Sequence, residues 1–355
     1  MNQVTAPSFR CLKSVYVYLP REVFELLRRV EAAVPYPFYR LDTPVGALRE
    51  ELVGAGALPS DFELPAGVGG ALALDELSAR VIDRVARVYE RPIAGAGTPL
   101  LSGLAGYPYR YFTFGSAEGL FHLLAQAAAR AGVREICTLA GEYEGFGAQA
   151  ANLGLEVRQV APEELAALRE PRYWFLSNPS ARDGNVLPEG LLPELLDRGH
   201  RVVLDLAYVG TTWPRSYDLR HENLLAILLS FSKPYGVFRY RMGFTFARRE
   251  VPSLYGSKWF SDPVRALQAV ALAEQVGPGG LVAALKERQA EAVKRIAEEW
   301  GLELEASDAF LVASLAAGGG AELAPAVRAL IEPFRRGERY RFCLTPYFHD
   351  HDRDR

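Results

Sequence analysis

Lysine is scarce in this chain of 355 residues. Only five lysines occur, at positions 13, 233, 258, 286 and 294, so arginine supplies nearly all of the positive charge. The formal net charge of -3 provides no wide basic surface, and nucleic acid is therefore not an expected partner. Against this background Lys233 needs an explanation, because it directly follows an apolar run in which a solvated basic residue has little reason to lie.

Cysteine and long apolar runs are also scarce. Cys11, Cys137 and Cys343 are odd in number and widely spaced, which excludes a disulfide framework and predicts reduced packing residues of a cytoplasmic protein. Runs such as AILLSF and AFLVASLAA are too short to cross a bilayer, and MNQVTAPSFRCLKS has no apolar signal core. We expect no membrane segment. We also expect no metal site, with the terminal HDHDRDR a solvated tail and His122 a packing residue.

Short runs rich in β-branched or aromatic residues predict strands in the middle of the chain. They are YRYFTF (109–114), REICTL (134–139), LEVRQV (155–160), RYWFLS (172–177), RVVLDLAY (201–208), AILLSF (226–231) and GFTFA (243–247). Helical patterns lie between most of them, such as the segment that Ser116 can cap and Gly132 can end. Strands that alternate with helices predict an α/β fold with a mixed, mostly parallel sheet covered on both faces.

The flanking regions have a different pattern. Residues 18–34 and 74–90 predict helices, residues 95–108 predict a loop, and long helices follow over 264–299 before short strands and another helix. This change predicts an N-terminal segment (1–75) that contributes to a small domain. A large domain (76–250) and the C-terminal, α+β part of the small domain (251–355) would follow.

Chemically useful side chains follow the predicted strands. Ligands of such sheets bind at the carboxyl ends of the strands, which all lie along one edge. The residues expected there are Ser116, Ala117, Tyr143, Asn178, Asp205, Tyr208, Ser230, Lys233 and Arg241. Each alone has an ordinary explanation, since serine caps helices and Asn-Pro marks turns. Together they would suit an anionic, aromatic, carbonyl-bearing cofactor.

The physical roles are distinct. The helix that begins at Ser116 would bind a phosphate with help from Ser230 and Arg241. An apolar, cation-rich setting would lower the pKa of Lys233 and allow it to form a Schiff base.

The remaining residues would hold the ring. A buried Asp205 would keep a pyridine nitrogen protonated. Asn178 and Tyr208 could donate hydrogen bonds to a ring oxygen, and Tyr143 could cover the ring face.

The motifs that contain these residues resemble those of fold-type I pyridoxal-phosphate enzymes, aminotransferase class I/II, over roughly residues 75 to 345. The resemblance rests on SFSKPYGVFRYRMG (230–243), DLAY (205–208), SNPS (177–180), GSAEG (115–119), GEYEGF (141–146) and RYRFCL (339–344). It implies a seven-stranded sheet in the large domain, bound pyridoxal 5'-phosphate, and a homodimer with active sites at the subunit interface.

The resemblance also implies a reaction. Lys233 would hold the cofactor as an internal aldimine and then move the α-proton, while an amino group passes between an amino acid and a 2-oxo acid. Arg341, with Asn178, would bind the substrate carboxylate, although Arg339 could take the place of Arg341. Decarboxylation, elimination, cyclisation or oxidation on the same site are alternatives.

The sequence departs from the family pattern in NPSARDGN, in Pro234 after the lysine, and in a shortened stretch from Arg335 to Arg341. Three other interpretations fit the sequence less well. Ser230 and Lys233 fit the S-x-x-K of penicillin-recognising enzymes, but the partner motifs are missing. GAGTPL (95–100) lacks the third glycine of a dinucleotide-binding loop. A degenerate, non-catalytic module would not need the intact Lys233, Asp205 and Arg241.

Overall fold

The computed structural model describes residues 9–13, 18–33, 54, 70–93, 97–130, 133–257, 263–319 and 323–348. A seven-stranded sheet with strand order β2-β9-β8-β6-β5-β3-β4 forms its centre. The strands are β2 (Tyr109–Thr113), β3 (Glu135–Leu139), β4 (Glu156–Val160), β5 (Tyr173–Ser177), β6 (Arg201–Asp205), β8 (Leu224–Ser230) and β9 (Gly243–Ala247). Every strand predicted from the sequence is present, and the predicted α/β fold class is confirmed.

The sheet is mixed because β9 runs antiparallel to both of its neighbours, β2 and β8. The other pairs are parallel. Successive residues of a strand point to opposite faces, and the core divides accordingly. In β5, Trp174 and Leu176 belong to one apolar cluster and Phe175 to the other. Both faces are therefore covered, as expected for buried parallel strands.

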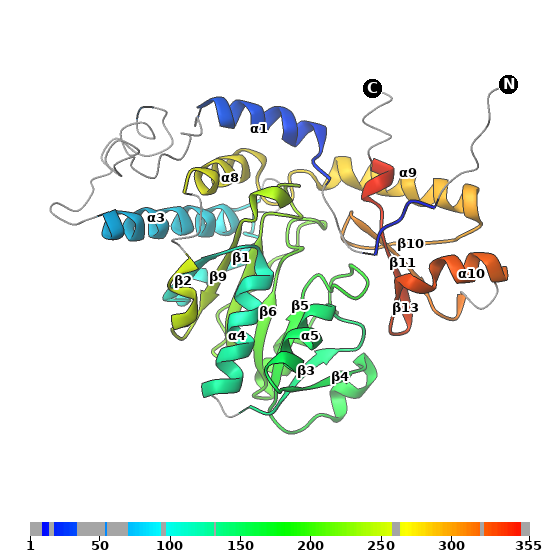
Figure 1. Ribbon diagram of the computed structural model, residues 1–355, viewed down its shortest axis with the longest axis horizontal. Coiled ribbons are helices and arrows are strands. Elements are labelled where there is room, and N and C mark those ends of the chain that lie inside the picture. The colour runs from blue at the N-terminus through cyan, green and yellow to red at the C-terminus, as the bar shows by residue number, and fades with distance from the viewer. Residues whose placement is uncertain are drawn as a thin grey trace.

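Helices cover the sheet in two groups, as Figure 1 shows. α4 (Ser116–Arg130) and α5 (Glu144–Asn152) supply Leu120, Leu124 and Phe146 to the cluster that contains Phe175. On the other side, α8 (Pro263–Val276) contacts both α3 (Gly70–Glu90) and α1 (Arg21–Ala33). A further helix, α6 (Leu191–Asp197), packs against β6.

A second, antiparallel sheet has the order β10-β11-β13-β12. Its strands are β10 (Glu305–Ala306), β11 (Val312–Ala316), β12 (Arg335–Arg336) and β13 (Arg339–Cys343), and its helices are α9 (Val282–Trp300) and α10 (Pro325–Ile331). Near the N-terminus, Leu12 pairs with Cys343, so both ends of the described chain meet here (Figure 1). The domain boundaries near residues 75 and 250 stay a prediction.

Some local expectations need correction. The segment 95–108, expected to be a loop, contains β1 (Leu101–Ser102), which pairs in parallel with β7 (Tyr217–Asp218). The helix expected from residue 74 already begins at Gly70. Short 3-10 helices complete the described elements: Leu104–Gly106, Pro162–Ala167, Phe238–Tyr240, Pro252–Leu254 and Glu332–Phe334. The HDHDRDR tail lies outside the described residues.

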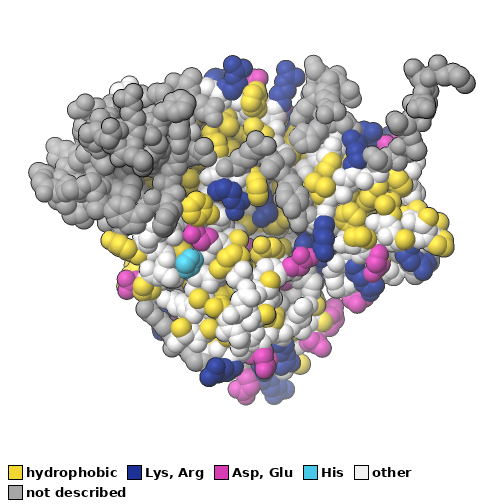
Figure 2. Space-filling model, viewed as in Figure 1, with side chains coloured by type: hydrophobic (Ala, Val, Ile, Leu, Met, Phe, Trp, Pro, Cys, Tyr) yellow, Lys and Arg dark blue, Asp and Glu magenta, His cyan; other side chains and the backbone are white. Residues whose placement is uncertain are grey.

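Two findings bear on partners. No helix within the described ranges is long and apolar enough to cross a membrane. Acidic and basic side chains lie interspersed on the face that Figure 2 shows, in keeping with a formal net charge of -3.

Gly119 allows α4 to lie close to the sheet. A Cβ at this position would lie 2.0 Å from Thr245 Oγ1 and 2.8 Å from Leu228 Cδ2. We expect Gly119→Ala to lower the free energy of unfolding by about 1–3 kcal/mol, measured by urea denaturation, because overpacking displaces the helix. Gly147→Ala in α5 is the matched control, since its Cβ would meet nothing within 4 Å. Equal stability of the two variants would contradict this explanation.

Candidate active site

A cavity of about 240 Å³ lies at the carboxyl ends of β6 and β8, beside the first turn of α4. It is lined by residues of both sheets. The expected site residues among its lining are Ser116, Ala117, Tyr143, Asp205, Tyr208, Ser230, Lys233, Arg241 and Arg341. The structure thus brings together every residue proposed from the sequence except Asn178 and the alternative arginine, Arg339.

One end of the cavity is suited to an anion. Ser116 and Ala117 begin α4, whose first N–H groups have no partners within the helix. Arg241 has a left-handed backbone (φ 51°), and its Nη2 donates to the Phe114 carbonyl at 2.7 Å. A Cβ on Gly243 would lie 2.5 Å from the backbone of Gly115, so this turn requires glycine. The helix N-terminus and the guanidinium together favour a phosphate.

Asp205 is the last residue of β6, lines the cavity and is buried. Its Oδ1 accepts the N–H of Ala207 at 2.9 Å, and its Oδ2 accepts the Ser116 hydroxyl at 3.3 Å. Burial raises the pKa of this carboxyl, and the charge of Lys233 opposes the rise. A second cation close to Asp205 would therefore stabilise the carboxylate further.

Lys233 and Arg341 approach the same tyrosine from different sheets. Lys233 Nζ lies 4.4 Å from the centroid of the Tyr208 ring. Arg341 donates from Nη2 to the Tyr208 hydroxyl and from Nη1 to the Lys13 carbonyl at 3.1 Å, and it is buried. Both cations thus contact Tyr208 and line the same cavity.

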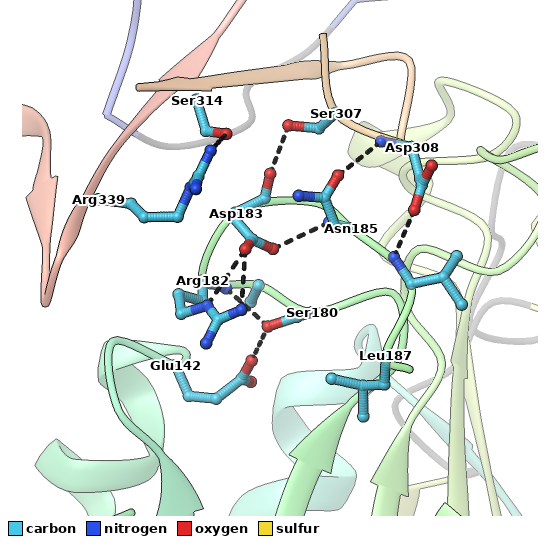
Figure 3. A network of polar contacts seen from close by, with 12 residues as sticks. Glu142, Ser180, Arg182, Asp183, Asn185, Leu187, Ser307, Asp308, Ser314 and Arg339 are labelled. Atoms are coloured by element: carbon cyan, nitrogen blue, oxygen red, sulfur yellow. Dashed lines mark hydrogen bonds and ion pairs between the residues drawn. The ribbon is translucent and has the colours of Figure 1, made fainter. Parts of the chain in front are cut away.

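Arg339 does not share this environment. Its guanidinium pairs with Glu305 and donates to Ser314 Oγ at 2.9 Å (Figure 3), and it is not among the cavity-lining residues. Of the two arginines that the sequence left open for a substrate carboxylate, the geometry favours Arg341.

Tyr143 and Asn178 are placed differently. Tyr143 precedes α5 and lines the cavity, where burial raises the pKa of its hydroxyl and the charge of Asp205 adds to the effect. Asn178 is buried outside the lining. Its Oδ1 accepts the N–H of Leu187 at 3.1 Å and the Tyr217 hydroxyl at 3.5 Å. In this structure Asn178 therefore supports the wall instead of forming it.

Glu142, which directly precedes Tyr143 in the chain, is a buried carboxylate that the sequence analysis did not single out. The Glu142 side chain accepts a hydrogen bond from the Ser180 hydroxyl (Figure 3) and another from the Ser177 hydroxyl. It thereby joins two segments that line or support the cavity. No spacing rule marks this residue in advance, because its partners lie 35 and 38 positions further along the chain.

The atypical segment NPSARDGN continues from this carboxylate toward the second sheet. Asn185 Oδ1 accepts the N–H of Asp308 at 2.9 Å, and Asp308 Oδ2 accepts the N–H of Val186 at 2.8 Å (Figure 3). Ser307 donates its hydroxyl to the carbonyl of Asp183. The segment therefore joins the wall of the cavity to the turn before β11.

Glu142 should make stability depend on pH. Burial raises its pKa above the ordinary 4.5, although the hydroxyls of Ser177 and Ser180 oppose the rise. The folded state then holds more protons than the unfolded chain, so the free energy of unfolding falls as pH rises from about 4.5 through the raised pKa. We expect Glu142→Gln to reduce this fall, measured by urea unfolding across that pH range. Unchanged pH dependence of stability in Glu142→Gln would contradict this role of Glu142. So would an equal reduction in the exposed control Glu194→Gln.

Other cavity residues were also missed by the sequence interpretation. Tyr18 comes from the N-terminal region, Leu311 directly precedes β11, and Arg336 lies in β12. Arg336 follows another arginine, and a pair of adjacent arginines gives no sign of which one faces inward. The three cysteines are free and buried, as expected of packing residues. No cluster of three or more His, Cys, Asp or Glu side chains suited to a metal occurs among the described residues.

The mixed seven-stranded sheet, with a lysine, a buried aspartate and a helix N-terminus around one cavity, is typical of the fold-type I pyridoxal-phosphate class of folds. Comparison with known families agrees. The chain belongs to the aminotransferase class I and II family, whose model matches residues 112–322.

Individual relatives are distant. The chain is 30% identical over 146 residues to a chloroplastic histidinol-phosphate aminotransferase of Nicotiana plumbaginifolia, covering 39% of this chain and 35% of that protein. It thus spans about a third of the length of this curated relative.

Solved structures show the fold over nearly the whole chain. YbdL from Escherichia coli, described as having a methionine aminotransferase function, superimposes with a TM-score of 0.56 at 17% identity, covering 96% of each chain. Histidinol-phosphate aminotransferase from Sinorhizobium meliloti, in complex with pyridoxal-5'-phosphate, gives a TM-score of 0.55 at 15% identity and covers 77% of this chain and 80% of that one.

Proposed function

We propose that this protein is a pyridoxal-phosphate-dependent aminotransferase that moves an amino group between an amino acid and a 2-oxo acid. The observation that supports this best is the convergence of Lys233, Asp205 and Arg341 on one cavity in a chain of the aminotransferase class I and II family.

The residues present fit the cofactor. The turn at Gly115 leaves no room for a Cβ on Gly243, which brings the backbone and Arg241 close to the start of α4, where a phosphate would bind. The Ser232 hydroxyl, also in the cavity lining, is buried and has no hydrogen-bond partner within the described protein. Asp205 would face the ring nitrogen, and Tyr143 would lie against the ring.

The chain's own groups would then perform the proton chemistry. Pyridoxal phosphate, when bound, supplies the electron sink that makes the α-proton of an amino acid acidic. The Lys233 amine would hold the cofactor, and once released it would accept the α-proton and return it to a neighbouring carbon. Arg341 would orient the substrate through a bidentate pair with its α-carboxylate. Tyr143 would cover the site against water.

The same site would also support decarboxylation, elimination, cyclisation or oxidation. The deciding experiment is the visible absorption spectrum of the protein with pyridoxal phosphate, before and after a pool of amino acids. A band that bleaches and returns on addition of a 2-oxo acid establishes transamination. A band that forms and does not return with any 2-oxo acid contradicts it and favours one of the other reactions.

We also propose a homodimer and a cytoplasmic location. Family resemblance supports the dimer, and three buried, free thiols are compatible with a reducing compartment. Light scattering tests the first part. A fully active monomer at working concentration would contradict it.

A further inference from the structure

Arg336 is a buried cation in the cavity whose charge the proposed reaction does not use. It lies in β12, lines the same cavity as Arg341, and its side chain is only 6% exposed. Its Nε and Nη1 are buried without a hydrogen-bond partner within the described protein. Unpaired buried donors are costly, and a guanidinium offers them in a planar fork that matches a carboxylate or a phosphate.

The one ion pair of Arg336 within the described residues leaves those donors free. Nη2 lies 3.5 Å from Glu144 Oε1. That glutamate side chain is 60% exposed and is not among the residues that line the cavity. Glu144 also pairs with Lys13, at 3.4 Å. A shared, exposed carboxylate therefore compensates only part of the buried charge.

The cavity lining carries more positive charge than the proposed function requires, and the additional charge is that of Arg336. The lining residues with a formal charge are Asp205, Lys233, Arg241, Arg336 and Arg341. In the proposed function, Arg241 faces the cofactor phosphate, Asp205 the ring nitrogen and Arg341 the α-carboxylate, while Lys233 holds the cofactor. A substrate with one carboxylate would thus leave the guanidinium of Arg336 with only the partial compensation that Glu144 provides.

Arg336 and Arg341 also act on each other. Burial lowers the pKa of Arg336, and the positive charge of Arg341 lowers it further, while Glu144, Tyr208 and Glu142 oppose the fall. An anion that contacts Arg336 would remove the cost of burial and the repulsion together.

We propose that Arg336 binds a second anionic group, so that the preferred substrates carry a carboxylate or a phosphate on their side chain in addition to the α-carboxylate. The assignment of the α-carboxylate to Arg341 rests on the proposed function. The anion site at Arg336 rests on its burial and its unpaired donors, and only the comparison with the other charged lining residues depends on the proposed function.

The test uses unreactive acids and the cofactor-loaded protein. Isothermal titration calorimetry would compare pentanoate, which has one carboxylate, with glutarate and 4-phosphonobutyrate, which carry a second anion at a similar distance. We expect both dianions to bind wild type more tightly than pentanoate. In Arg336→Gln the affinity for both dianions should fall by roughly tenfold to a hundredfold, while the affinity for pentanoate should stay nearly unchanged. The dianion whose affinity falls more in this variant identifies the group, carboxylate or phosphate, that Arg336 prefers.

Arg335→Gln is the matched control, because this neighbour lies in the same strand, is 47% exposed and pairs with Glu332 at 3.7 Å. Its preference for dianions should equal that of wild type. Arg336→Lys, which keeps the charge without the fork, should retain part of the preference and serves if the glutamine variant does not fold. Equal binding of pentanoate and glutarate by wild type, or an unchanged ratio in both Arg336 variants, would overturn the proposal.

The two hypotheses fail separately. Loss of dianion binding in Arg336→Gln, in a protein that transaminates no amino acid, would retain the anion site and remove the proposed function. Transamination of amino acids with neutral side chains, with no preference for dianions, would retain the proposed function and remove the anion site.

Discussion

Replacing Lys233 with alanine is expected to remove the visible absorption band of bound pyridoxal phosphate and to lower turnover by roughly a thousandfold or more. The amine is expected to hold the cofactor and to carry the α-proton, and proton transfer by a positioned side chain alone contributes roughly a hundredfold to ten-thousandfold. Absorption after gel filtration and single-turnover kinetics with amino acids measure the two effects.

Lys294→Ala is the control for this variant. Lys294 lies on α9, its side chain is 78% exposed, and it forms an i,i+4 pair with Glu298 at 3.8 Å. Its removal should change neither the band nor turnover. A borohydride-reduced adduct that maps to Lys286 or Lys294, or a persistent band in Lys233→Ala, would disprove the assignment.

Asp205→Asn is expected to lower turnover by roughly a hundredfold to a thousandfold, the range seen when a preorganised electrostatic contact to the reacting group is lost. The amide keeps the shape of the carboxyl and can still accept the Ala207 N–H, but it has no charge to hold a proton on the ring nitrogen. The cofactor should still bind, because Lys233 and the end of the cavity near Ser116 are intact. Stopped-flow kinetics of the bound cofactor's spectrum measure the effect.

The exposed pair of Asp218 and Arg220 provides the control. Asp218→Asn removes a carboxylate from the surface strand β7 and should leave turnover within twofold of wild type, as for most surface substitutions. If Asp205→Asn is as active as Asp218→Asn, the carboxylate has no part in the chemistry.

The sequence predicted the seven-stranded sheet well because its signal is local. Runs such as RVVLDLAY and AILLSF are apolar enough to be buried on both faces, and helices between them force parallel pairing. The carboxyl ends of such strands meet at one edge, so Asp205 and Lys233 could be placed in one site without a structure.

The rest of the site depends on long-range contacts. Glu142 is defined by Ser177 and Ser180. Arg341 was proposed from the sequence, but only its contacts with Tyr208 and with the Lys13 carbonyl favour it over Arg339. The parallel pairing of Leu101 and Tyr217 is likewise invisible in a segment of glycines and prolines. For Asn178 the sequence pattern and the structure emphasise different roles. A motif fixed its position in the chain, but the partners of its side chain, Leu187 and Tyr217, place it behind the wall.

The turn between β12 and β13 has a consequence for the evolution of specificity. Arg336 pairs with Arg339 across Gly337 and Glu338, and Gly337 has a positive φ of 57°. Side chains alternate between the faces of a strand, so a one-residue insertion or deletion that shifts this pairing would turn Arg336 outward and Arg335 inward. A longer change could bring a neutral residue to the same place. A length change in one hairpin could thus alter the charge of the cavity while Lys233, Asp205 and Arg241 stay where they are. Substrate range and cofactor chemistry are therefore separable by insertion and deletion as well as by substitution.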